Sequence, residues 1–103
     1  MSPALRYFSV RTPEICLERI ARRIAEGGHD VAEDIVRRRF VRSHQNLPAY
    51  TAAADLWRIY EASGAKPCLA AEGHNGRLVY DDPDCHAQAN AAVRAFLSGF
   101  TAR

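Results

Sequence analysis

The densest group of side chains able to do chemistry is a set of arginines between positions 19 and 42. Two segments with helical spacing carry them, and the segments meet at Gly27, Gly28 and His29. Guanidinium groups stay charged at neutral pH and can hold two phosphate oxygens at once. Two helices that present arginines beside a tight turn therefore predict a clamp for phosphate. The arginines of this set are Arg19, Arg22, Arg23, Arg37, Arg38, Arg39 and Arg42.

The same charges also fit a simpler interpretation, in which they form solvated helix faces. Acidic residues stand three or four positions away, at the spacing that brings two side chains together on a helix. On composition alone this interpretation is the better of the two. His29 has no carboxylate at the spacing of a catalytic triad, so it predicts no general base. The ion pairs to expect are Arg22 with Glu18 or Glu26, and Arg37 or Arg38 with Glu33 or Asp34.

Spacing argues against two other kinds of site. The only lysine, Lys66, is followed by Pro67 where a phosphate-binding P-loop needs Ser or Thr, and the first glycine of that motif is missing. The three cysteines predict reduced thiols. A zinc site could be drawn from two cysteines and two histidines, but no Cys-x-x-Cys or His-x3-His spacing supports it. Those four residues are Cys68, His74, Cys85 and His86.

Charge and hydropathy narrow the class of protein further. Of 103 residues, 14 are basic and 12 acidic, and the net charge of +2 is too small to indicate nucleic acid. Trp57 and Tyr60 are expected in the core and offer too few rings for a base-stacking surface. No apolar run is long enough to cross a membrane, and no signal-peptide pattern is present. We therefore expect a cytoplasmic protein with no membrane contact.

Hydrophobic periodicity and turn residues predict the elements that position the arginines. Thr12 and Pro13 predict a helix start, and Asp30 with Glu33 resembles a capping box. Asp82 predicts the cap of the last helix. The predicted elements are a strand at 5–10, a helix from 13 to the glycines at 27–28, a helix from 30, a short helix at 49–54, a strand at 56–60, a hairpin of 68–71 with 77–80, and a helix from 83 to 97.

This order predicts an α/β protein in which residues 1–103 form a single unit. The sheet is expected to be small, partial and mostly parallel, with flanking helices and a C-terminal hairpin plus helix. The strands at 5–10 and 56–60 are separated by three helical pieces, so they should pair in parallel through a right-handed crossover. Only the first and last helices are expected to cover the faces of this sheet.

A family resemblance arises from several short motifs taken in order. The motifs are Thr12-Pro13-Glu14, Arg23, Gly27-Gly28-His29, IVRRRF at 35–40, Asn46-Leu47-Pro48 and Trp57 to Gly64. Together they resemble the C-terminal half of the zeta-toxin-like P-loop kinases, bacterial proteins often labelled predicted ABC-type or AAA-type ATPases. The resemblance covers roughly residues 5 to 73.

The resemblance implies an ATP-dependent phosphotransferase in which arginines of a lid close on nucleotide phosphates. ATP and Mg²⁺ are the implied cofactors, and an amino sugar linked to a nucleotide belongs to the family's substrate class. The family's toxins pair with a small antitoxin protein, which is an implied partner. The residues that the resemblance places in the lid are Arg23, His29, Arg37, Arg38 and Arg39.

The family's Walker A loop, its catalytic acidic residue and much of its sugar site lie in an N-terminal half that has no counterpart in this sequence. We therefore expect the chain alone to bind ATP and Mg²⁺ weakly and to lack kinase or ATPase activity. It would be a truncated protein, the product of a degenerate gene, or half of a split protein completed by a P-loop half. The alternatives are a small Arg-rich nucleic-acid binder, which the twelve acidic residues disfavour, and a homodimer that buries an open sheet edge.

Overall fold

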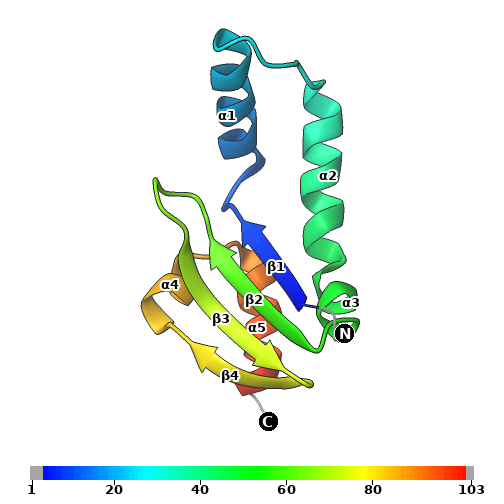
Figure 1. The fold of residues 1–103 in the computed structure, drawn as a ribbon, viewed down its shortest axis with the longest axis vertical. Helices are drawn as coiled ribbons and strands as arrows, with labels where there is room; N and C mark the ends of the chain where they lie inside the picture. The colour runs from blue at the N-terminus through cyan, green and yellow to red at the C-terminus, as the bar shows by residue number, and fades with distance from the viewer. Residues whose placement is uncertain (1–3, 102–103) are drawn as a thin grey trace.

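The computed structural model describes residues 4–101 (Figure 1). These residues form four strands and five helices, which follow one another along the chain in this order: β1 Ala4–Ser9, α1 Pro13–Ala25, α2 Glu33–Gln45, α3 Leu47–Ala52, β2 Leu56–Glu61, β3 Cys68–His74, β4 Arg77–Asp81, α4 Pro83–Ala87 and α5 Ala91–Thr101. The predicted α/β class is confirmed.

All four strands lie in one sheet, in the order β1-β2-β3-β4. β1 and β2 pair in parallel, with Tyr7 opposite Ile59, as the three helices between them predict. β2–β3 and β3–β4 are antiparallel pairs. The sheet is therefore mixed, and the expectation of a mostly parallel sheet is wrong. The physical reason is connection length, because β2, β3 and β4 are joined by loops too short for a parallel crossover.

The predicted hairpin is present and its turn is tighter than expected. Gly73 and His74 belong to β3, so only Asn75 and Gly76 connect the strands. Both have positive φ, 50° for Asn75 and 78° for Gly76. This is the backbone of a two-residue hairpin turn that matches the twist of the strands, and Asn-Gly is its preferred sequence.

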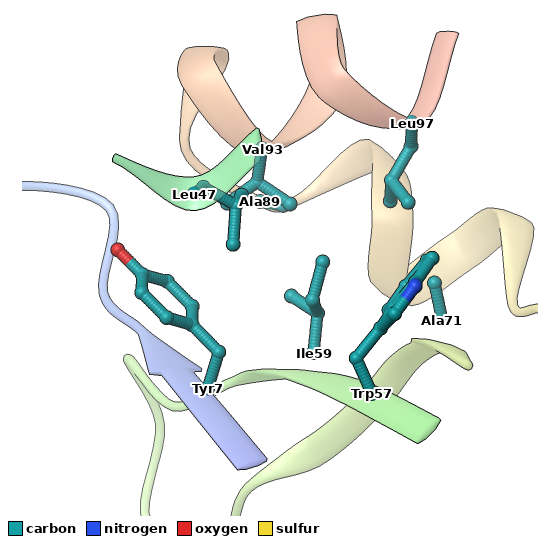
Figure 2. Packing of buried hydrophobic residues seen from close by; sticks show 8 residues of the cluster. All are labelled: Tyr7, Leu47, Trp57, Ile59, Ala71, Ala89, Val93 and Leu97. Atoms are coloured by element: carbon teal, nitrogen blue, oxygen red, sulfur yellow. The ribbon is translucent and has the colours of Figure 1, made fainter. Parts of the chain in front are cut away.

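The hydrophobic core lies on one face of the sheet. Trp57 and Ile59 point from β2 toward α5, where Val93 and Leu97 are fully buried (Figure 2). α3 contributes Leu47, also fully buried. The cluster consists of Tyr7, Leu47, Trp57, Ile59, Ala71, Ala89, Val93 and Leu97. Helices α3 and α5, with Ala89 from the connection between α4 and α5, thus supply the apolar side chains that cover this face.

The opposite face of the sheet, which we call the open face, carries Phe8, Arg58, Tyr60, Glu72 and Tyr80. In Figure 1, α5 lies behind the sheet and no described helix lies in front of it. Phe8 and Tyr60 are register partners whose rings stack 4.7 Å apart, and Arg58 pairs with Glu72. Phe8 remains 55% exposed and Tyr80 44%.

Helix α1 does not cover the sheet, contrary to expectation. It has no buried residue, and together with α2 it projects beyond the end of β1 (Figure 1). The apolar side chains of α1 that predicted a sheet contact, such as Ile20, instead face a cleft shared with α2. The two helices therefore form a hairpin outside the sheet layers.

Two predicted helix boundaries are wrong as well. α2 begins at Glu33 after Ala32 with no side-chain cap, so Asp30 and Glu33 form no capping box. The last helix is split into α4 and α5, and the Oδ1 atom of Asn90 accepts a hydrogen bond from the Ala92 amide at the start of α5. Asp82 does cap α4 as predicted, because its carboxylate accepts from the amides of Asp84 and Cys85.

The tightest packing restraint in the sheet is the contact between Gly73 and Trp57. A Cβ atom at position 73 would overlap the indole ring, which is 1% exposed and has no room to move away. We expect Gly73→Ala to lower the free energy of unfolding by about 2 kcal/mol, measured by urea denaturation. Gly64→Ala is the matched control, since nothing lies within 4 Å of a Cβ there. Equal losses for the two variants would contradict this account.

Candidate functional site

Helix α1 is attached to the rest of the molecule by two arginines. The guanidinium group of Arg19 donates to the backbone carbonyls of Ala62, at 2.5 Å, and Gly64, at 3.4 Å, in the connection after β2. Arg37 of α2 pairs with Glu14 of α1 at 2.9 Å and with Glu33 of its own helix at 3.1 Å. Arg19 thus joins α1 to the connection after β2, and the Arg37–Glu14 pair joins α1 to α2.

Helix α2 is attached to β1 by buried hydrogen bonds. The Nε2 atom of His44 lies 2.8 Å from the Ser9 hydroxyl, and its Nδ1 atom lies 2.8 Å from the Phe40 carbonyl. Because a carbonyl only accepts, Nδ1 carries a hydrogen, and in the neutral ring Nε2 accepts from the Ser9 hydroxyl. Tyr7 and Ser43 share a second bond of 2.9 Å, and burial raises the pKa of the Tyr7 hydroxyl.

Between the two helices and the end of β1 lies a cleft of about 380 Å³. This volume falls within the range of about 300–1,000 Å³ typical of small-molecule sites. Its walls are mainly apolar, with arginine, histidine and hydroxyl groups placed among the apolar side chains. α1 contributes Cys16, Ile20 and Arg23; α2 contributes Val36, Arg39, Phe40, Ser43 and His44; β1 and the connections contribute Tyr7, Phe8, Val10, His29 and Val31.

The structure separates the five predicted lid residues into two groups. Arg23, His29 and Arg39 line the cleft, where they come from α1, from the connection and from α2. Arg37 and Arg38 do not line it. Arg38 pairs with Asp34 at 3.3 Å, and Arg37 is engaged by the two glutamates described above.

Three of the ion pairs predicted for a solvated helix face are present. They are Arg22 with Glu18 at 3.5 Å, Arg37 with Glu33, and Arg38 with Asp34. Exposed pairs of this kind contribute little to stability, but they neutralise the arginines that take part. Within residues 4–101, Arg23 and Arg39 form no ion pair, so the two arginines of the cleft keep their positive charge for an anion.

The sequence contains a signal that selects the arginines of the cleft. Val36, Arg39, Phe40 and Ser43 follow the spacing i, i+3, i+4, i+7, which is one face of a helix. Arg37 and Arg38 fall outside this series. Cys16, Ile20 and Arg23 follow the same rule on α1. On α2, helical phase rather than density of arginines identifies which charge faces the cleft. On α1, Arg19 shares the phase of Cys16 but donates to the Ala62 carbonyl and does not line the cleft.

The groups in the cleft suit anion binding better than covalent chemistry. Burial raises the pKa of the Cys16 thiol, so at neutral pH this residue is a weak nucleophile. Within the described part of the chain, no three His, Cys, Asp or Glu side chains gather so as to hold a metal ion.

Among these same residues, no helix combines the length and the apolar character required to span a membrane.

Comparisons with protein-family models, with curated proteins and with solved structures find no match to this chain. The functional interpretation therefore depends on the geometry of the cleft and on the chemistry of the side chains that line it.

The pair between Arg37 and Glu14 has a measurable electrostatic consequence. The guanidinium group of Arg37 lowers the pKa of the Glu14 carboxyl, chiefly by donating a hydrogen bond to the charged form. A lowered folded-state pKa means that the pair favours the folded state above the ordinary glutamate range and loses this effect as the pH falls through it. We expect Arg37→Gln to raise the Glu14 pKa, measured by carbon-detected NMR titration.

Arg38→Gln is the control for this titration. It removes an exposed arginine from the same helix but leaves the contact with Glu14 intact, because Arg38 pairs with Asp34. An equal shift of the Glu14 pKa in both variants would mean that general charge, not the interhelical pair, sets the titration.

Proposed function

We propose that the α1–α2 hairpin binds the phosphate groups of a nucleotide, as the lid of a zeta-toxin-like ATP-dependent phosphotransferase. One observation carries this proposal: the two helices direct Arg23 and Arg39 into one cleft together with His29, while other arginines of the set are neutralised on the outer surface. Unpaired guanidinium groups on facing helices suit a ligand with several anionic oxygens.

Each group of the cleft has a role that follows from its chemistry. Arg23 and Arg39 donate to phosphate oxygens from opposite walls and offset charge that develops during phosphoryl transfer. Ile20 and Phe40 limit the access of water, which strengthens these electrostatic interactions. His29 lies in the connection between the helices, where it contributes a further hydrogen-bonding group.

The 103 residues contain no P-loop motif, so this function requires a P-loop half that also carries the catalytic acidic residue, either within the same protein or as a separate chain. That half would bring ATP, Mg²⁺ and the phosphoryl acceptor to the arginines. A small antitoxin protein is the further partner that this function implies. The isolated chain would bind phosphates weakly and would turn over no ATP.

The test is an NMR titration of the labelled chain with ATP. We expect amide shifts centred on Arg23, His29 and Arg39 and an affinity in the millimolar range. Arg23→Gln and Arg39→Gln should each weaken binding by about tenfold, which corresponds to loss of one charge-assisted contact of about 1.4 kcal/mol.

Arg38→Gln is the control for the titration, since it removes the same charge from the helix of Arg39 at a position outside the cleft. Its affinity for ATP should stay within about twofold of the original chain, a change below 0.5 kcal/mol. An equal loss in all three variants would show that ATP responds only to net charge and would refute the lid assignment.

A second candidate function is self-association through the open face. The observation in its favour is the group of aromatic side chains left uncovered there, including Phe8 and Tyr80. Arg58 and Glu72 on the same surface pair with each other within the chain. When a two-fold axis brings this surface against its own copy, these paired charges therefore leave no net charge to repel the second copy.

Sedimentation equilibrium tests this second function. We expect a dimer whose association constant falls about tenfold in Tyr80→Ser, because an exposed ring would lose its contact across the axis. Val41→Ser is the control, since Val41 is 52% exposed but belongs to α2. A monomer at high concentration, or an equal effect of both substitutions, would exclude dimerisation through this face.

A further inference from the structure

Two cysteines that are 17 positions apart in the sequence are in contact in the structure. The Sγ atom of Cys85 in α4 donates a hydrogen bond to the backbone carbonyl of Cys68, the first residue of β3, at 3.2 Å. Cys68 is exposed and Cys85 is buried. The third cysteine, Cys16, lies on α1 in the cleft.

The position of Cys85 is fixed by several bonds around it. The Asp82 carboxylate accepts from the Cys85 amide at 3.2 Å, and the Asp82 amide donates to the Ala70 carbonyl at 2.9 Å. At the next residue, Nδ1 of His86 lies 3.1 Å from the Asp81 carboxylate. The start of α4 is therefore held against β3, and the approach of the two cysteines is a property of the folded backbone rather than of a single rotamer.

The two thiols differ in reactivity. Burial raises the pKa of Cys85 to about 12, and the neighbouring Cys68 side chain adds to this effect. Cys85 is thus a protonated thiol at neutral pH, shielded from solvent. Cys68 is accessible to a reagent from outside, so it is the residue that meets an oxidant first. An exposed cysteine beside a buried one matches the attacking and resolving positions of a redox pair.

We propose that Cys68 and Cys85 form a redox-sensitive dithiol that closes into a disulfide by exchange with a small-molecule disulfide such as oxidised glutathione. The site lies at the start of β3 and α4, and it is independent of the arginine cleft and of the proposed phosphate binding.

The exchange has two balanced steps. The Cys68 thiolate attacks one sulfur of oxidised glutathione, a mixed disulfide forms, and one glutathione thiolate leaves. The Cys85 sulfur then attacks the Cys68 sulfur, and its proton passes to the second glutathione sulfur, which leaves as a thiol. Two protein thiols are oxidised to one disulfide, and one glutathione disulfide is reduced to two thiols.

The new bond would join the two ends of the segment that contains the β3–β4 hairpin. A crosslink across a loop of this size limits the unfolded chain and raises thermal stability. Because α4 is already held at the start of β3, little rearrangement of the backbone is required. We expect the melting temperature of the oxidised chain to rise by about 5–10 °C, and the rise to disappear when the disulfide is reduced.

The test is incubation of the full chain in glutathione buffers, followed by mass spectrometry of non-reduced peptides. The expected product is a peptide pair linked through Cys68 and Cys85, formed equally in the original chain and in Cys16→Ser. Cys85→Ser should stop at a stable glutathione adduct on Cys68. Cys68→Ser should acquire no adduct at Cys85, because that thiol is buried.

The proposal fails if the original chain accumulates glutathione adducts without the linked pair, or if Cys16 reacts as fast as Cys68. It also fails if the linked pair forms only after the chain is unfolded in urea. The measurement on the original chain decides the matter even if a serine variant does not fold. A chain that binds no ATP leaves this result unaffected, so failure of the phosphate proposal and failure of the dithiol are separable.

Discussion

The parallel pairing of β1 with β2 is the constraint on which the rest of the structure depends. Parallel neighbours cannot be joined by a tight turn, so residues 10–55 must leave the sheet and return in the same direction. The return passes through α3, which places Leu47 in the core beside α5. The remainder of the crossover, which is longer than a parallel connection requires, forms the α1–α2 hairpin and thereby the cleft.

The sequence predicts elements well where one residue fixes a local conformation. Pro13 begins α1, Asn75 with Gly76 closes the hairpin, and Asp82 caps α4. Prediction fails where two residues could each cap a helix, or where tertiary contacts decide how a helix packs. Asp30 has the chemistry of a cap but lies too early in the chain, and Asn90 breaks a continuous apolar stripe by capping α5. Helix α1 packs beside α2 rather than on the sheet. Hydrophobic periodicity shows that a helix has an apolar face but does not specify the element that this face contacts.

The contacts around the cleft were predictable within one helix but not between elements. Density of arginine indicated the two segments that line the cleft, and helical spacing to Glu18, Glu33 and Asp34 indicated which arginines would form ion pairs. The pair between Arg37 and Glu14 joins two helices, so no spacing rule predicts it. The contact between Cys68 and Cys85 could not be predicted from sequence spacing either, because it requires β3 and α4 to pack together after the hairpin has formed.

The two walls of the cleft are fastened by different kinds of bond. The α2 wall is tied to β1 by the buried bond between Ser9 and His44, whereas α1 has no buried residue and is held by Arg19 and Arg37. Solvent competes with such polar contacts, so we expect α1 to detach at a lower cost in free energy than global unfolding. Such an opening would let the cleft admit a ligand larger than its resting volume while the sheet, α2 and α5 stay folded.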